Sequence, residues 1–173
     1  MSTNERVAEL KRKLGEISDV GSTISVLHWD QETCMPPKGA EARSYQLATL
    51  SALKHRLFTA ESLGTLLRDL HASDGLDPDD ATLVEVTLYD YDRATKLPEE
   101  FVHTLAAEQS KALEVWVQAR KESNFGLFRP NLAKLIELAR RKAEYFGYEE
   151  SPYDALVEEY ERGMTSAELK RIF

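Results

Sequence analysis

Apolar and small residues recur every three or four positions over the first thirty residues, which is the spacing of one face of an α-helix. The stripe consists of Val7, Leu10, Leu14, Ile17, Gly21, Ile24 and His28. It predicts one long helix from near residue 3 to near residue 33. At about 1.5 Å per residue, such a helix is roughly 45 Å long and spans a small domain.

Two adjacent prolines, Pro36 and Pro37, follow this helix. Because proline lacks a backbone donor and clashes with the preceding turn, the helix is expected to end near residues 34–35. Helical spacing resumes at Ala40. The sequence therefore predicts a helical hairpin with Trp29 close to its corner.

The rest of the chain is also expected to be helical. Further helices are predicted over residues 40–53, 61–70, 81–96, 98–122 and 130–147, with an irregular aromatic link over 124–129. Asp77 and Pro78 form an N-cap followed by proline at the first helical position. Gly147 is suited to end the sixth helix because glycine adopts positive φ without strain.

Two capping boxes are predicted near the end of the chain, one pairing Ser151 with Asp154 and the other pairing Thr165 with Glu168. The second box opens a helix of only about two turns, which needs a packing partner to be stable. We therefore expect residues 1–173 to be one helical amino-terminal region of a longer protein, truncated inside a helix.

Period-two alternation is absent, so no strand is predicted. The expected fold class is all-α: a multi-helix antiparallel array with a long first helix and a helical hairpin, and no sheet. The net charge of -8 carries no basic stripe, which argues against nucleic acid as a partner. No apolar run approaches a membrane span. The single cysteine, Cys34, excludes an internal disulfide and indicates a reducing, cytoplasmic setting.

The histidines show no metal-binding spacing. They are His28, His55, His71 and His103. A helical zinc hydrolase requires two histidines four residues apart, and no pair here has that spacing. Glu100 and His103 match one half of a di-iron motif, but such a site needs two copies. The sequence thus predicts no catalytic residue and no metal ligand within this chain.

Trp29 and Asp30 are candidates to line a cleft beside the hairpin corner. A tryptophan at such a corner more often anchors a core, and that alternative stays open. The later aromatic residues, from Trp116 to Tyr160, are likewise interpreted first as packing around helix ends.

Several short motifs occur in an order that resembles the carboxypeptidase Taq family of metallocarboxypeptidases. They are Leu27-His28-Trp29-Asp30-Gln31-Glu32 with Met35-Pro36, Gly39-Ala40 with Arg43 and Gln46, Arg93-Ala94-Thr95-Lys96-Leu97-Pro98, Trp116 with Ala119-Arg120, Asn124-Phe125, Tyr153-Asp154-Ala155-Leu156 and Glu159-Tyr160-Glu161 with Gly163-Met164. The resemblance covers nearly the whole chain. Arg162 and Asn131 depart from the pattern, where proline and histidine are usual.

The resemblance implies an all-helical homodimeric enzyme with a long groove, which removes single residues from peptide C-termini with a divalent metal, usually zinc or cobalt. The family's His-Glu-x-x-His helix lies beyond the end of this chain. The resemblance therefore implies that this piece is inactive alone, binds no metal, and supplies one wall of the groove with Trp29 and Asp30. The alternative function is a stand-alone helical protein-interaction module.

Overall fold

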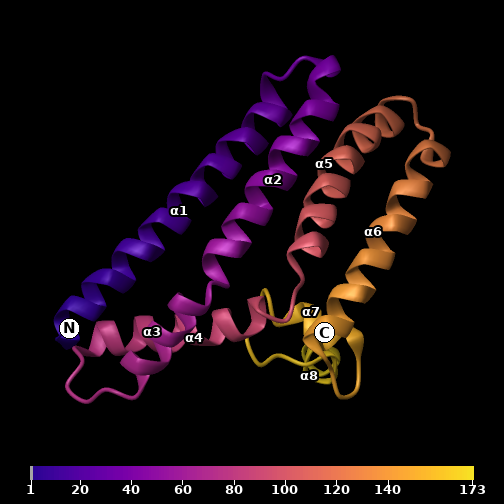
Figure 1. Ribbon diagram of the computed structural model, residues 1–173. Helices are drawn as coiled ribbons and strands as arrows, with labels where there is room; N and C mark the ends of the chain where they lie inside the picture. Colours follow the sequence, from indigo (N-terminus) through magenta and orange to yellow (C-terminus); the bar gives the residue numbers. More distant parts are fainter. Residues whose placement is uncertain (1) are drawn as a thin grey trace. The chain divides into compact units, whose positions relative to one another are not determined.

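The computed structural model describes residues 2–173, and every regular element in that range is a helix (Figure 1). The elements are α1 (Thr3–Thr33), the 3₁₀ turn η1 (Pro37–Gly39), α2 (Ala40–Phe58), α3 (Glu61–His71), α4 (Pro78–Ala94), α5 (Glu99–Lys121), α6 (Phe125–Phe146), α7 (Pro152–Val157) and α8 (Ser166–Ile172). The predicted all-α fold class, with a long first helix, is confirmed for the described range.

The first helix begins and ends where the hydrophobic pattern predicts. The Ser2 hydroxyl accepts a hydrogen bond from the backbone N–H of Glu5, and the Glu5 carboxylate accepts one from the backbone N–H of Ser2, so a capping box opens α1. Cys34 closes the helix by donating its backbone N–H to the carbonyl of Asp30 at 2.9 Å. Helix α2 then runs back alongside α1, which confirms the helical hairpin (Figure 1).

The chain forms two compact units, the first ending at Ser110 and the second comprising Lys111–Phe173. The boundary falls inside α5, so this helix contributes to both units. Each unit is described by itself below.

The first unit contains the large apolar core. Helices α1, α3 and α4 supply its buried residues, which are Val7, Leu10, Ile17, Leu63, Leu66, Leu67, Leu70, Val84 and Tyr91. The first part of the stripe on α1, from Val7 to Ile17, is thus explained by its packing on α3 and α4, whereas Gly21 faces Lys54 of α2 and His28 is exposed. Burying a leucine side chain contributes roughly 1.5–3 kcal/mol, so this cluster dominates the stability of the first unit.

The contact between α3 and α4 depends on a glycine. A Cβ atom built on Gly64 would lie 2.3 Å from the hydroxyl oxygen of Tyr91. The tyrosine ring occupies the space beside that glycine, packs edge-on against Phe58 with ring centroids 6.4 Å apart, and lies 5.5 Å from the Arg68 guanidinium. Helix α3 therefore approaches α4 closely because position 64 lacks a side chain.

Helix α6 begins five residues earlier than the sequence pattern predicts. The irregular link expected over residues 124–129 is wrong, because the Asn124 side chain accepts a hydrogen bond from the N–H of Gly126 at 3.1 Å and caps a helix that starts at Phe125. Pro130 lies inside α6 rather than at its start, where its missing N–H removes one backbone hydrogen bond. Gly147 ends the helix with φ 78°, as predicted.

The capping residues near the end of the second unit form other hydrogen bonds than predicted. Ser151 accepts a hydrogen bond from Tyr153, whereas Asp154 accepts one from the backbone N–H of Ser166 at 2.6 Å. The predicted box at Ser151 is therefore incomplete: Asp154 accepts from the Ser151 backbone, but the Ser151 hydroxyl bonds Tyr153 instead of Asp154, and Asp154 also holds the start of α8. The box formed by Thr165 and Glu168 is confirmed.

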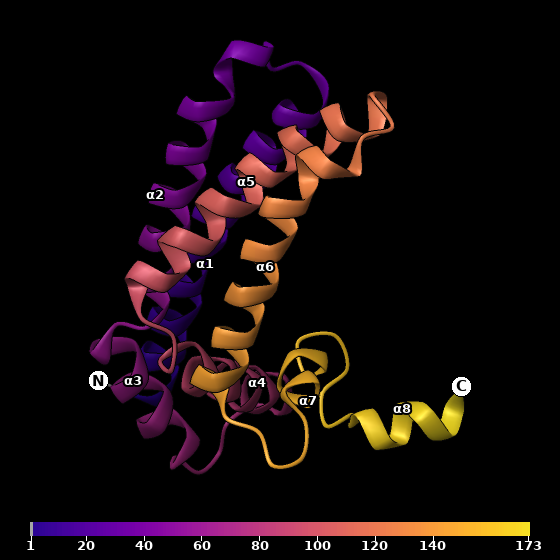
Figure 2. The ribbon, with the colours of Figure 1, turned by 90° about the vertical axis from the view of Figure 1, so that its right-hand side faces the viewer.

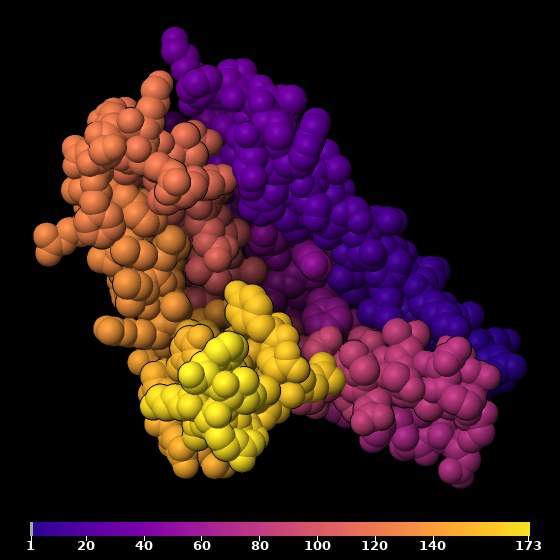
Figure 3. Space-filling model, turned by 180° about the vertical axis from the view of Figure 1, so that it is seen from behind, coloured from indigo at the N-terminus to yellow at the C-terminus, as the bar shows by residue number. Residues whose placement is uncertain are grey.

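Helix α7 packs on the end of α6, and the surfaces of these two segments, orange and yellow, adjoin in Figure 3. An ion pair of 2.6 Å between Lys142 of α6 and Glu159, just after α7, reinforces that contact. Helix α8 follows α7 and projects away from it (Figure 2). Ile172 is 60% exposed on the last turn of α8. No helix in the range 2–173 is long and apolar enough to cross a membrane.

Candidate functional site

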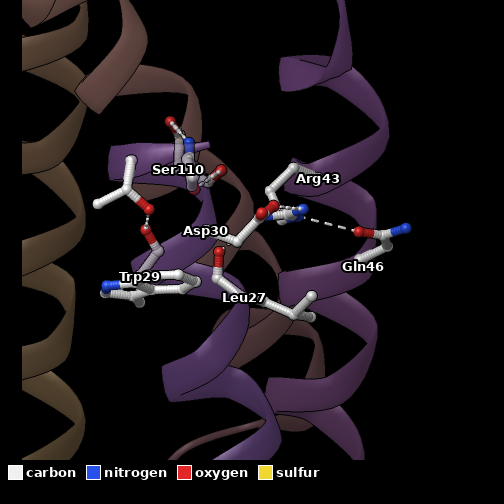
Figure 4. A network of polar contacts seen from close by, with 8 residues as sticks. Leu27, Trp29, Asp30, Arg43, Gln46 and Ser110 are labelled. Carbon is white, nitrogen blue, oxygen red and sulfur yellow. Dashed lines mark hydrogen bonds and ion pairs between the residues drawn. The ribbon is translucent and has the colours of Figure 1, made fainter. Parts of the chain in front are cut away.

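The corner between α1 and α2 is held by Arg43. Its side chain is largely buried, donates to the backbone carbonyl of Leu27 and forms an ion pair with Asp30 (Figure 4). Arg43 also donates to the side-chain oxygen of Gln46, one turn further along α2, at 3.0 Å. Because charge-assisted hydrogen bonds are stronger than neutral ones, this network fixes how the end of α1 lies against α2.

Asp30 is therefore a structural anchor, with its carboxylate turned toward α2. Trp29 points to the other side of α1 and is 61% exposed (Figure 4). The alternative interpretation of Trp29 as a core anchor is wrong. Val26 lies three residues earlier on the same helical face and is also 61% exposed, so an apolar strip faces solvent next to the corner.

A buried polar pair lies on another side of α1. The Gln31 amide donates to the backbone carbonyl of Ser110 on α5 at 3.1 Å, and the Ser110 hydroxyl donates to the Gln31 side-chain oxygen at 3.1 Å. The two residues are 7% and 2% exposed. Both belong to the first unit, so the pair fixes the register of the first half of α5 against α1. We call it the Gln31–Ser110 pair.

The sequence pattern does not predict the Gln31–Ser110 pair. Gln31 follows Leu27 and His28 by four and three residues, and therefore continues the apolar stripe with a polar residue. A polar residue at an apolar position of the stripe is the one local sign of a buried polar contact. The partner lies 79 residues away, and no local pattern indicates it.

A pocket in the second unit lies at the turn between α5 and α6. Its volume is about 620 Å³, and it is lined by Trp116, Ala119, Arg120, Ser123, Asn124, Phe125 and Phe128. The Arg120 guanidinium lies 5.7 Å from the Trp116 ring, in a cation–π arrangement. Trp116 and Phe125 are 43% and 61% exposed, so these aromatic residues do not pack around helix ends as predicted. We call this the Trp116 pocket.

Residues 2–173 hold no metal centre of the kind the family resemblance implies. Within this range no three His, Cys, Asp or Glu side chains lie close enough together to hold a metal ion. The donor set described here therefore does not fit the family's metal. His55 contacts the carbonyl of Leu97 at 2.8 Å, which is a structural role.

Two carboxyl groups have shifted pKa values, and both serve as helix caps. Hydrogen bonds from the side chain and backbone of Ser166 hold the pKa of Asp154 below its ordinary 3.8. Hydrogen bonds from the backbone and side chain of Thr165 likewise lower the pKa of Glu168 from its ordinary 4.5. Both shifts result mainly from hydrogen bonds at the start of α8, which stabilise the charged form of each carboxyl group.

The sequence of this chain matches a family of known proteins. The family model of the carboxypeptidase Taq (M32) metallopeptidases matches residues 9–173. Thermostable carboxypeptidase 1 of Pyrococcus furiosus is 34% identical over 170 residues, which are 98% of this chain and 34% of the relative. Carboxypeptidase 1 of Bacillus subtilis is 34% identical over 161 residues, which are 92% of this chain and 32% of the relative.

The solved structures agree with the sequence relatives. The structure of BsuCP is 32% identical, covers 97% of this chain with 34% of its own length, and has a TM-score of 0.94. The structure of Pyrococcus furiosus carboxypeptidase is 34% identical, covers 98% of this chain and has a TM-score of 0.78. The chain spans about a third of the length of the relatives it matches. By its sequence match over residues 9–173 and its helical structure, the chain belongs to the carboxypeptidase Taq (M32) metallopeptidase family.

Proposed function

We propose that this chain is the amino-terminal helical part of a metal-dependent carboxypeptidase that releases single residues from the C-termini of peptides. The observation that carries the proposal is the family match over residues 9–173. Because residues 2–173 provide no group of metal ligands, the reacting groups are assigned to the part of the enzyme that the relatives have beyond the matched third.

The role proposed for this part is to form one wall of the peptide groove. Trp29 offers an exposed indole for contact with the substrate, and Val26 extends the same apolar strip. Asp30 acts through Arg43, which holds the end of α1 that carries Trp29. An exposed aromatic side chain on a rigid helix binds apolar side chains with a small loss of conformational entropy.

Three further properties belong to this proposal. Zinc or cobalt is the proposed metal of the whole enzyme, and a homodimer is its proposed oligomeric state. Both proposals are based on the family resemblance. The proposed cytoplasmic location is supported by the single cysteine, Cys34, which cannot form an internal disulfide.

A chimaera tests the activity. Residues 1–173 replace the matching first third of Bacillus subtilis carboxypeptidase 1, and release of C-terminal residues from amino-blocked peptides is measured for the chimaera and for the isolated chain. We expect the chimaera to be active, to lose activity with a chelator, and to regain it with zinc or cobalt. The isolated chain is expected to release nothing. Metal-dependent release by the pure isolated chain, or a folded but inactive chimaera, contradicts the proposal.

The role of Trp29 is tested in the same chimaera. We expect Trp29→Ala to raise KM about fivefold and to leave kcat nearly unchanged, because a lost apolar contact of roughly 1 kcal/mol weakens binding by about that factor. The matched control is Val86→Ala, which removes another exposed apolar side chain in the first unit. An unchanged KM in Trp29→Ala contradicts the proposal that Trp29 lines the groove.

A further inference from the structure

The second unit exposes more large apolar side chains than it buries. Of the sixteen large apolar side chains that are exposed in the described range, ten lie between residues 111 and 173, although this unit is the shorter one. Its buried apolar residues are Ala112, Ala119, Leu138, Ala143, Phe146, Ala155 and Val157. Four of these seven are alanines, which bury little area each. The second unit therefore has apolar surface that requires cover.

The Trp116 pocket is where this surface is hollowed. Helix α5 supplies Trp116 and Arg120, and α6 supplies Phe125 and Phe128 from the other side of the turn. Its volume of about 620 Å³ has room for several side chains. Asn124 caps α6 and thereby fixes the position of Phe125, the first residue of the helix. The pocket is thus made by the end of α5 and the start of α6.

The charge around the Trp116 pocket is positive, although the whole chain is acidic. Arg120 is the one charged residue among those that line it in the described structure, and its guanidinium is positioned over the Trp116 ring. Lys121 and Arg129 are exposed and are the neighbours of Arg120 and Phe128 along the chain. The nearby acid, Glu122, accepts a hydrogen bond from Gln118. An apolar occupant that also carries a carboxylate fits this environment.

We propose that the Trp116 pocket is a docking site for an apolar side chain flanked by a carboxylate, presented by the part of the enzyme that the relatives have beyond the matched region. This inference rests on the proposed function, since only a longer enzyme has such a part. It is supported by the share of the relatives that this chain spans, about a third, and by the cation Arg120 in the lining of the pocket. The apolar side chain contacts Trp116 and Phe125, and the carboxylate binds Arg120.

Side-chain accessibility provides the test. Hydroxyl-radical oxidation of Trp116 and Phe125, measured by mass spectrometry of their peptides, is compared between the isolated chain and the Bacillus subtilis chimaera. We expect both side chains to react readily in the isolated chain and at least about fivefold less in the chimaera. A chimaera on thermostable carboxypeptidase 1 of Pyrococcus furiosus provides a second folded form if the first does not fold. Equal oxidation in the isolated chain and in the folded chimaera overturns the inference.

A charge reversal tests the proposed carboxylate. Arg120→Glu is expected to restore oxidation of Trp116 and Phe125 in the chimaera and to lower its thermal midpoint, with little effect on the isolated chain. Arg12→Glu, at an exposed position of α1, is the matched control and is expected to change neither measurement. An Arg120→Glu chimaera that keeps its protection shows that no carboxylate binds there.

The outcomes separate this inference from the proposed function. An active chimaera with an unprotected pocket overturns the docking site alone, and an inactive chimaera with a protected pocket contradicts the activity alone. If oxidation of Trp116 falls in the isolated chain as its concentration rises, with a dimer in sedimentation, a second copy covers the pocket and the inference is wrong.

Discussion

At the scale of single residues, the Gln31–Ser110 pair is the contact whose loss has the clearest expected cost. Each side chain donates one hydrogen bond to the other residue, and both are buried in the first unit. A buried polar group that loses its partner costs about 1–3 kcal/mol, whereas a complete apolar replacement can be nearly neutral. The pair is therefore suited to a double-mutant cycle.

We expect Ser110→Ala and Gln31→Leu each to lower the free energy of unfolding by about 1–3 kcal/mol in urea titrations. The double variant is expected to cost less than the sum, with a coupling energy of about 0.5–3 kcal/mol. The control is Ser25→Ala, which removes an exposed hydroxyl that bonds to its own helix. Additive effects of the two substitutions contradict the hydrogen bond from the Ser110 hydroxyl to the Gln31 side chain, which is the one that both substitutions remove.

Asp154 makes α8 sensitive to acid. Its pKa is lowered in the folded chain by the hydrogen bonds from Ser166, so the unfolded state binds more protons near pH 3.8. The contribution of Asp154 is full above that pH and is lost as the pH falls through the lower, folded pKa. The pKa of Glu168 is lowered as well, so protonation of Glu168 at acidic pH also removes stabilisation from α8.

We therefore expect Asp154→Ala to reduce the helical ¹³Cα shifts of α8 at neutral pH. The difference from the unsubstituted chain is expected to shrink below pH 3.8 and to vanish once Asp154 is protonated in both states. Glu149→Ala removes an acid that lies outside both caps and is the control. A difference that persists unchanged in acid shows that the charge of Asp154 is not what holds α8.

At the scale of elements, the two glycines Gly15 and Gly64 occupy similar helical backbones in different surroundings. A Cβ atom on Gly15 meets nothing within 4 Å, whereas one on Gly64 would lie 2.4 Å from Cζ of Tyr91. Alanine is favoured over glycine inside a helix by roughly 1 kcal/mol when there is space for it. Packing between α3 and α4 reverses that preference at position 64.

We expect Gly15→Ala to stabilise the chain by about 0.5–1 kcal/mol and Gly64→Ala to destabilise it by about 1–3 kcal/mol, both measured by urea unfolding. Adding Tyr91→Leu to Gly64→Ala removes the ring atoms in the way and is expected to cost less than the sum of the single changes. Similar stability of the two glycine variants contradicts the close approach of α3 to Tyr91.

The helices whose ends depend on nearby residues could be predicted from the sequence. The spacing of apolar residues and the pair Pro36 and Pro37 determine both ends of α1, because a helix period and a missing donor are local properties. Pro130 is a strong helix-start signal and predicts too late a start for α6, whereas the weaker cap by Asn124, six residues earlier, decides where the helix begins. Local signals can therefore compete, and only packing and hydrogen bonds decide between them.

The candidate site was predictable only in part. The family motif includes both Trp29 and Asp30. The exposure of Trp29 and the ion pair of Asp30 depend on how the end of α1 lies against α2, which carries Arg43. The Gln31–Ser110 pair joins helices separated by 79 residues, which no local pattern could indicate. Asp154 has the spacing of a capping box with Ser151, yet it caps α8 because the turn after α7 brings Ser166 to it.

At the scale of the whole molecule, the two units differ in what stabilises them. The cluster of buried leucines lies entirely in the first unit, and the second unit buries mostly alanines. Because the stabilisation from burial scales with apolar area, the second unit is expected to be the less stable one. Each unit has one tryptophan, Trp29 in the first and Trp116 in the second, which gives each its own fluorescent reporter.

We expect the isolated chain to unfold in two steps. In Trp29→Phe the remaining Trp116 reports the second unit, and in Trp116→Phe the remaining Trp29 reports the first. The Trp116 signal is expected to change at the lower urea concentration, and a stability difference of about 2 kcal/mol separates the midpoints by about 1 M for a slope near 2 kcal/mol/M. Circular dichroism of each variant is the control, since it must contain both transitions. Coincident midpoints for both tryptophans and for circular dichroism would show that α5 couples the units into one cooperative structure.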